Sequence, residues 1–295
     1  MSDIEKLLKE YLDYLEIEKN RSVKTRTAYG RYLRDFISTT EIQRVSDITQ
    51  DVVREYRINL ARRDIKKITQ SYYVIALRNF LKYLIRRNIK VLSPETIELP
   101  KISRRDIEIL DYKELERLLS APQGAHIRPL RDKAVLEMLF STGLRVSELC
   151  GLDRYIDMER GEFSVRGKGE KLRVVFLSQS AKKTLKEYLG ARTDADEALF
   201  ISLTKKGKVL GRITPRAVQR LVDYNARKAG IMANVHPHQL RHQFATDLLI
   251  NGADLRAVQE LLGHANVSTT QVYTHLTNRK LREIHEAFHA RRRRP

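Results

Sequence analysis

A histidine and an arginine stand three residues apart in the run Pro237-His238-Gln239-Leu240-Arg241. Proline is favourable at the first position of a helix, so the run predicts a helix that opens at Pro237. The spacing places His238 and Arg241 on one face of that helix. A guanidinium offers a planar fork to two phosphate oxygens, and an imidazole can donate or exchange a proton. Taken alone, however, such a pair is more often a polar helix surface.

Histidines gathered in this part of the chain raise the alternative of a metal site: His236, His238, His242 and His264. His238 and His242 have the spacing of two ligands on a helix. The glutamate of the zinc-hydrolase helix is missing between them, and no cysteine or acidic cluster completes a ligand set. We therefore expect neither a metal nor a cofactor.

A second arginine follows a glycine in the run from Ser141 to Leu149. Gly143 permits a sharp turn, after which Arg145 enters a helix whose leucines face inward. An arginine so close to apolar residues needs a partner. That partner is either Glu148, three residues later, or a phosphate, with Glu148 only orienting the side chain.

Three further residues attract little notice one by one. Lys168 lies between two glycines, His264 ends a Leu-Gly-His run, and Tyr273 comes nine residues later. A lysine in a turn is ordinary, and a helical tyrosine is most often a core or interface residue in a chain with 13 of them. Only their order, together with Arg145 and the His238 and Arg241 pair, makes them candidates for one site.

Helical spacing of apolar residues predicts four helices in the first hundred residues, at about 4–18, 25–36, 50–62 and 69–87. Any one basic cluster in residues 1–92 is better explained by a solvated face, but three such clusters beside aromatic-rich helices predict a helical DNA-binding domain. Pro94 and Pro100, in a stretch with little periodicity, predict a linker over 93–106. The second domain is then 107–295.

The second domain is predicted to be mainly α with one small antiparallel sheet. Helices are expected at about 111–120, 128–140, 180–189, 214–229, 237–250, 254–262 and 268–289, with Asp111 capping the first and Glu114 completing its capping box. Two strands near 162–166 and 172–177 form a hairpin with Lys168 at its tip.

The composition favours a polyanionic partner. The formal net charge is +19, with basic excess in both halves, so both domains are expected to touch nucleic acid as a clamp. Ribosomal and membrane-surface proteins share such a charge, and composition does not separate these classes. A single cysteine, Cys150, and no apolar run long enough for a bilayer predict a cytoplasmic protein without membrane association.

The ordered combination of motifs resembles the tyrosine recombinase (phage integrase) family. It comprises the arginine after Thr-Gly, the lysine of Gly-Lys-Gly, the His-x-Leu-Arg-His run, Leu-Gly-His and the tyrosine nine residues on. The length is most similar to the Xer branch, although compact phage and integron integrases share the plan. Two departures concern the branch: Arg154 to Ile156 replace a Trp-containing run, and Phe176 stands where the second hairpin strand commonly has proline.

The resemblance implies that Tyr273 attacks a DNA phosphodiester and forms a 3′-phosphotyrosyl link, without metal or ATP. Arg145, Arg241 and His264 would stabilise the charge of the transition state. Lys168 would protonate the leaving 5′-oxygen, and His238 would assist proton movement at the nucleophile. A relaxing topoisomerase and a non-catalytic DNA-binding protein are the alternatives, and the latter would not need competent residues at all six positions.

The resemblance also implies the partners. These are double-stranded DNA with an inverted-repeat recombination site and further copies of the chain in a tetrameric synapse, with a second recombinase or an activator left open. The segment after Thr277 either packs on its own domain or, as in the family, docks on a neighbouring subunit. Chromosome dimer resolution and mobile-element integration are both compatible with the sequence.

Overall fold

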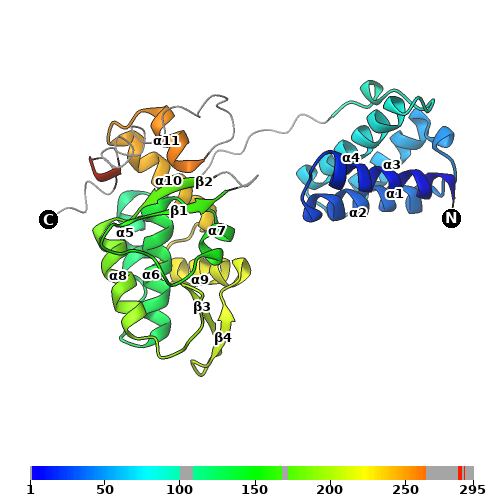
Figure 1. The fold of residues 1–295 in the computed structure, drawn as a ribbon. Coiled ribbons are helices and arrows are strands. Elements are labelled where there is room, and N and C mark those ends of the chain that lie inside the picture. Colours follow the sequence, from blue (N-terminus) through cyan, green and yellow to red (C-terminus); the bar gives the residue numbers. More distant parts are fainter. Residues whose placement is uncertain (1, 100–108, 168–171, 264–284, 288, 290–295) are drawn as a thin grey trace. The chain divides into compact units, whose positions relative to one another are not determined.

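The computed structural model describes residues 2–99, 109–167, 172–263, 285–287 and 289. The chain divides into two units, Met1–Arg105 and Asp106–Pro295, each with its own apolar core (Figure 1). The predicted fold class, mainly α with a small amount of antiparallel sheet, is confirmed. Within the described parts, no helix is both long and apolar enough to cross a membrane.

The first unit packs helices around one core. Its helices are α1 (Asp3–Asp13), extended by a π-helical turn (Tyr14–Glu18), α2 (Val23–Thr40), α3 (Gln50–Arg62) and α4 (Lys67–Arg86), with a short 3-10 turn at Val45–Asp47. Of the apolar residues at helical spacing in the first predicted helix, Ile4, Leu8 and Tyr11 are among those buried, and Leu7 is partly buried. The 3.6-residue period thus positioned this face correctly.

Part of the expected linker packs on the first unit. Pro94–Thr96 form a 3-10 turn (η3), and Ile97 is buried in the core. Arg78 of α4 donates 2.8 Å hydrogen bonds to the Ile97 carbonyl and to the Glu95 carboxylate. Two prolines are typical of a linker, but here an arginine and one buried isoleucine attach the segment to α4.

The second unit is built around α6 (Ile127–Thr142), in which every residue from 134 to 142 is buried. A helix buried on all sides is covered by its neighbours, here α5 (Tyr112–Ser120), α8 (Gln179–Gly190), α9 (Pro215–Lys228) and α10 (Pro237–Ile250). The expected capping box of α5 is present: the Asp111 carboxylate accepts from the Glu114 amide at 2.7 Å, and Glu114 accepts from the Asp111 amide at 3.2 Å.

Two hairpins flank these helices, where the sequence predicted one sheet. Strands β1 (Glu162–Arg166) and β2 (Leu172–Phe176) pair antiparallel with Val165 opposite Arg173, as expected. Strands β3 (Ile201–Leu203) and β4 (Val209–Arg212) form a second hairpin with an irregular register. The single-sheet prediction was therefore wrong, because a three-residue strand is too short to show an alternating pattern.

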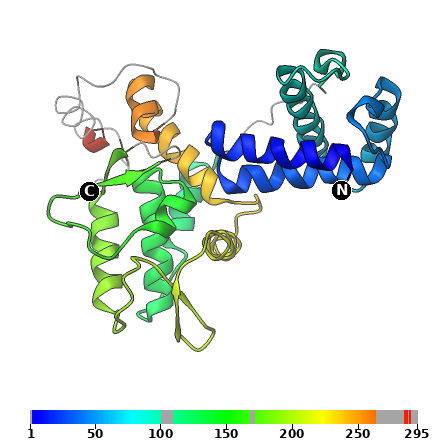
Figure 2. The same ribbon diagram turned by 45° about the vertical axis from the view of Figure 1, so that its right-hand side comes forward.

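The candidate site residues lie at one end of this unit. This end is formed by the β1–β2 hairpin together with α7 (Val146–Gly151), α10 and α11 (Leu255–Leu262), which lie close to the hairpin (Figures 1 and 2). Phe176, Phe244, Leu261 and Leu262 belong to one buried cluster there. Phe176, the departure from proline noted above, fills this core. The cluster packs β2, α10 and α11 together.

Of the helix expected at 268–289, only residues 285–287 and 289 are described, and they pack on the same chain. Residues 285–287 are helical, and the His285 ring nitrogen Nε2 lies 2.7 Å from the Ser141 carbonyl oxygen of α6. His289 Nδ1 lies 3.3 Å from an Asp247 carboxylate oxygen of α10. The two alternatives for this segment were packing on its own domain and docking on a neighbouring subunit. The described residues pack on their own domain.

Candidate active site

The turn that precedes Arg145 needs glycine. Helix α6 ends at Gly143, which has φ +58° in the left-handed region. A Cβ built there would lie 2.5 Å from Cδ1 of Phe244, which is itself buried on α10. Both the backbone conformation and the close approach of α10 therefore favour glycine. The turn brings Arg145 to the N-cap position of α7, at the start of the helix that the sequence predicted there.

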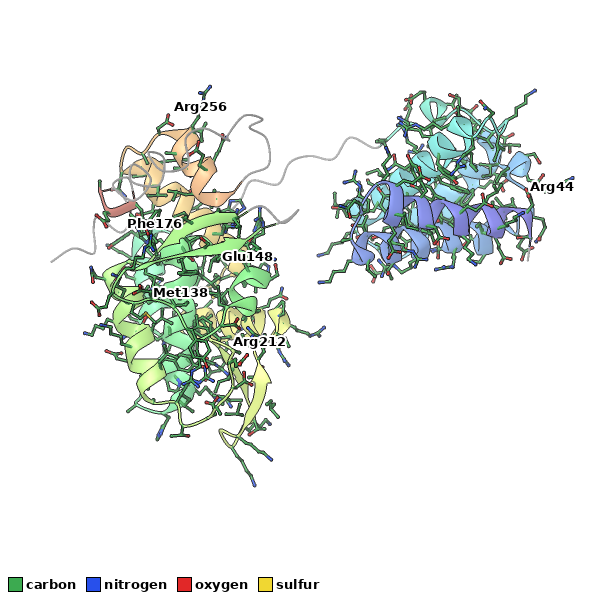
Figure 3. All side chains as sticks on the ribbon, viewed as in Figure 1. Arg44, Met138, Glu148, Phe176, Arg212 and Arg256 are labelled. Atoms are coloured by element: carbon green, nitrogen blue, oxygen red, sulfur yellow. The ribbon has the colours of Figure 1, made fainter. Side chains whose placement is uncertain are left out.

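Glu148 is shared by two arginines. It accepts hydrogen bonds from the Arg145 amide and from Arg145 Nη1, both at 2.8 Å. It also accepts from both terminal nitrogens of Arg173, at 3.0 and 2.7 Å. Burial alone would raise the pKa of Glu148, but the bonds from Arg173 and Arg145 outweigh it and lower that pKa to about 2. The carboxylate is therefore charged at all ordinary pH values. Figure 3 shows Glu148 beside the β1–β2 hairpin of the second unit.

Arg241 is a buried cation held by backbone carbonyls. Its side chain donates to the Gly143 carbonyl at 2.6 Å and to the Leu262 carbonyl at 2.5 Å. Both carbonyls stand at helix C-termini, where the helix dipole favours positive charge. Burial lowers the pKa of Arg241 to about 10, with Arg145 and Arg173 adding to the effect. Among the described residues Arg241 forms no ion pair, so it keeps a full positive charge for an anion.

The C-terminus of α11 collects three arginines. The Leu261 carbonyl accepts from Arg173 Nε at 3.2 Å, and the Leu262 carbonyl accepts from Arg241. The carbonyl of the capping Gly263 accepts from Arg145 Nη2 at 3.4 Å. Gly263 has φ +63°, and a Cβ there would lie 2.9 Å from Arg173 Cδ. One helix end thus places three guanidinium groups next to each other.

His238 lies in the first turn of α10, as predicted, and is exposed. Its ring centroid is 4.5 Å from that of His242. Partial burial lowers the pKa of His238, and the positive charges of His242, Arg241 and Arg145 lower it further. The lowered pKa favours the neutral imidazole, which is able to accept a proton.

The structure brings together Arg145, His238 and Arg241 of the six predicted site residues. Lys168, His264 and Tyr273 lie outside the described residues. As for the metal alternative, the part of the chain that the structure describes contains no group of three histidine, cysteine or acidic side chains able to share an ion.

Sequence reasoning missed Arg173. This side chain is only 8% exposed and connects Glu148 of α7 to the Leu261 carbonyl of α11. The available signal was a charged residue inside the apolar strand Leu172–Phe176, where burial requires a partner. The identity of that partner was not visible in a strand 25 residues from Glu148.

Family comparison agrees with both units. Residues 8–88 match the N-terminal SAM-like domain of phage integrases, and residues 108–280 match the phage integrase family itself. The chain belongs to the phage integrase family. The family predicted from the motifs, the tyrosine recombinases, is thereby confirmed.

Similar proteins within the phage integrase family include Xer proteins. A tyrosine recombinase XerD from Halalkalibacterium halodurans is 35% identical over 303 residues, covering 99% of this chain and 100% of that protein. A tyrosine recombinase XerC from Escherichia coli O139:H28 is 37% identical over 302 residues, covering 100% and 99%. The predicted likeness to the Xer branch is confirmed.

Solved structures of the phage integrase family share the fold. The Tn1549 transposon integrase in complex with a circular intermediate DNA aligns with a TM-score of 0.71 at 20% identity, covering 88% of this chain and 92% of that one. XerH site-specific recombinase bound to palindromic difH substrate aligns with a TM-score of 0.65 at 24% identity, covering 94% and 82%. At these identities the likeness establishes the fold.

Proposed function

We propose that this protein is a site-specific tyrosine recombinase that cuts and rejoins DNA through Tyr273. Its family makes it a DNA recombinase, and the observation that carries the assignment of its site is the arginine cluster at the end of α11. Arg145 and Arg241 come from elements almost a hundred residues apart, yet both donate to neighbouring carbonyls of one helix end. Such a cluster of fixed cations suits a phosphodiester.

The two arginines have complementary roles in this proposal. Arg241 is 3% exposed and held by two backbone carbonyls, whereas the Arg145 side chain is 32% exposed, with one short bond from Nη1 to Glu148 and one long bond from Nη2 to Gly263. The more exposed Arg145 guanidinium therefore retains donor capacity for a phosphate oxygen. As the phosphate becomes pentavalent, negative charge gathers on its non-bridging oxygens. Each pre-positioned donor lowers the barrier by roughly 3–4 kcal/mol.

The remaining proton transfers are assigned to the other predicted residues. Tyr273 attacks the phosphorus, the bond to the 5′-oxygen breaks, and a 3′-phosphotyrosyl link forms. We assign Lys168 as the acid for the departing 5′-oxygen and His264 as a further donor to the phosphate. The lowered pKa of His238 supports a role in accepting a proton near the nucleophile.

This chemistry requires neither metal nor ATP in our proposal. The arginines supply the positive charge that a metal ion would otherwise bring to the phosphate. The energy of the broken bond is retained in the phosphotyrosyl link, so a 5′-hydroxyl of the partner strand can reverse the step.

Double-stranded DNA with an inverted-repeat site is the proposed substrate. The charge of +19 supports a polyanionic partner, and α9 presents Arg216, Arg220 and Arg227 as exposed residues at helical spacing. A tetrameric synapse, with or without a second recombinase or an activator, follows from the family resemblance. Because such DNA is genomic and the named relatives are bacterial, we propose a cytoplasmic location.

The test is covalent adduct formation. DNA bound by the protein is first selected from a random-sequence pool, and the selected duplex is nicked near its centre so that cleavage becomes irreversible. Wild type should form a denaturant-stable adduct without added metal or ATP, whereas Tyr273→Phe should bind the duplex and form none. An adduct with Tyr273→Phe refutes the nucleophile assignment. Strand exchange between two duplexes then separates a recombinase from a relaxing topoisomerase.

A further inference from the structure

Arg173 is a buried cation in a short apolar strand of the second unit. Its side chain is 8% exposed, between Leu172 and Val174 of β2. A buried guanidinium is tolerated only where hydrogen bonds and opposite charge compensate for the water it has lost. Arg173 therefore needs such partners, and those it has belong to elements of the candidate active site.

The contacts of Arg173 connect two elements that carry site residues. Nη1 and Nη2 of Arg173 donate hydrogen bonds to the two carboxylate oxygens of Glu148, at 3.0 and 2.7 Å. Nε donates to the Leu261 carbonyl at 3.2 Å. Gly263 leaves no room between the helix end and this side chain, since a Cβ there would lie 2.9 Å from Arg173 Cδ. Arg173 thus fastens α7 to the C-terminus of α11.

The same contacts determine how far Glu148 neutralises the charge of Arg145. With Arg173 on both of its oxygens, Glu148 is a shared partner and Arg145 is only partly neutralised. The group of Arg145, Arg173 and Glu148 carries a formal charge of +1. Without Arg173, Glu148 would pair with Arg145 alone and the pair would be neutral.

We propose that Arg173 is a positioning residue for DNA cleavage, which holds Glu148 and the end of α11 so that Arg145 is only partly neutralised and stays oriented toward the scissile phosphate. This proposal rests on the proposed function. Arg173 does not itself touch the phosphate in this role. The geometry it fixes belongs to Arg145 and to the helix end that also holds Arg241.

A matched control distinguishes positioning from simple stabilisation. Arg192 is another buried arginine of the same unit, and its side chain is fully enclosed. It forms a forked ion pair with Asp194 and donates to the Ala198 and Leu199 carbonyls. Replacement of either arginine by lysine keeps the charge but loses the fork. Of the two, Arg173 is the one whose contacts reach site elements.

The first measurement is single-turnover cleavage of the nicked duplex by folded protein at saturating concentration. We expect Arg173→Lys to cleave roughly 10- to 100-fold more slowly than wild type, because misplacement by about 1 Å has effects of that size. DNA affinity should be unchanged, and Arg192→Lys should cleave at the wild-type rate even if its melting temperature falls. Cleavage by Arg173→Lys at the wild-type rate overturns the proposal.

The second measurement is amide hydrogen exchange of the free protein, which needs no catalysis. Arg173→Lys should accelerate exchange in α7 and at residues 258–263, whereas Arg192→Lys should do so only around residues 192–200. Unchanged exchange at α7 and at the end of α11 in Arg173→Lys overturns the proposal. If wild type forms no adduct, the proposed function fails, and the exchange experiment still decides the role of Arg173.

A paired variant covers the case in which Arg173→Lys does not fold. Changing Arg173 and Glu148 together to glutamine removes both buried charges, which proteins tolerate better than the loss of one partner. The folded double variant should bind the duplex and cleave slowly. Wild-type cleavage by this variant overturns the proposal equally.

Discussion

The guanidinium of Arg241 donates a 2.6 Å hydrogen bond to the carbonyl of Gly143, two residues before Arg145. The buried arginine therefore holds the turn that presents the more exposed one. Replacing Arg241 should therefore also disturb the position of Arg145.

Arg241→Lys should bind DNA but form the covalent adduct slowly. Lysine keeps a charge but cannot reach both the Gly143 and Leu262 carbonyls, so the donor geometry at the phosphate is lost. We expect a decrease of roughly 100- to 1000-fold in the single-turnover rate. Arg160→Lys, an exposed arginine paired with Glu162, is the control and should cleave normally. Equal cleavage rates for the two variants would show that Arg241 does not act in cleavage.

Gly143→Ala should destabilise the second unit. The added Cβ meets Phe244 at 2.5 Å, and φ of +58° is unfavourable for alanine. Such strain costs about 1–3 kcal/mol of unfolding free energy. Urea unfolding followed by circular dichroism measures the loss. Gly190→Ala has open space around its Cβ within a helix and should be neutral or stabilising, so a similar loss in both variants would contradict the steric explanation.

The charge of Glu148 should contribute to stability above about pH 4.5. Its pKa is lowered from 4.5 to about 2 in the folded protein, chiefly by Arg173 once the opposing effect of burial is overcome. A lowered acid pKa stabilises the fold above the unfolded-state pKa, and this contribution, roughly 3 kcal/mol, is lost as pH falls from 4.5 toward 2. Unfolding free energies of wild type and Glu148→Gln should therefore converge toward pH 2. A difference that is constant between pH 7 and pH 2 would refute this.

Arg145→Gln should raise the pKa of His238. In the wild type, burial lowers that pKa first, and the charges of His242, Arg241 and Arg145 lower it further. Removing one of these charges relieves part of the effect, so His238 should hold its proton to a higher pH. Proton NMR titration of the imidazole in the free protein measures the change. Arg160→Gln should leave the titration unchanged, and an identical His238 curve in Arg145→Gln would place the two residues out of electrostatic reach.

Several features of the fold and of the site follow from short-range sequence rules. Pro237 at the start of α10, the capping box of Asp111 and Glu114, and the turn at Gly143 each depend on residues within one helical turn. Their hydrogen bonds are determined by spacing and backbone conformation alone. The family, too, is recognisable from the order of the motifs along the chain.

The tertiary structure alone decided which partners the buried cations have. The carbonyls that hold Arg241 come from α6 and α11, and the carboxylate that holds Arg173 comes from α7. A buried guanidinium needs compensating groups, but sequence spacing does not say which distant groups will arrive. Packing of β2, α10 and α11 into one apolar cluster brings them together. For this reason Arg145 and Arg241 could be predicted as candidates from the sequence, whereas the contacts of Arg173 and of the α11 terminus required the fold.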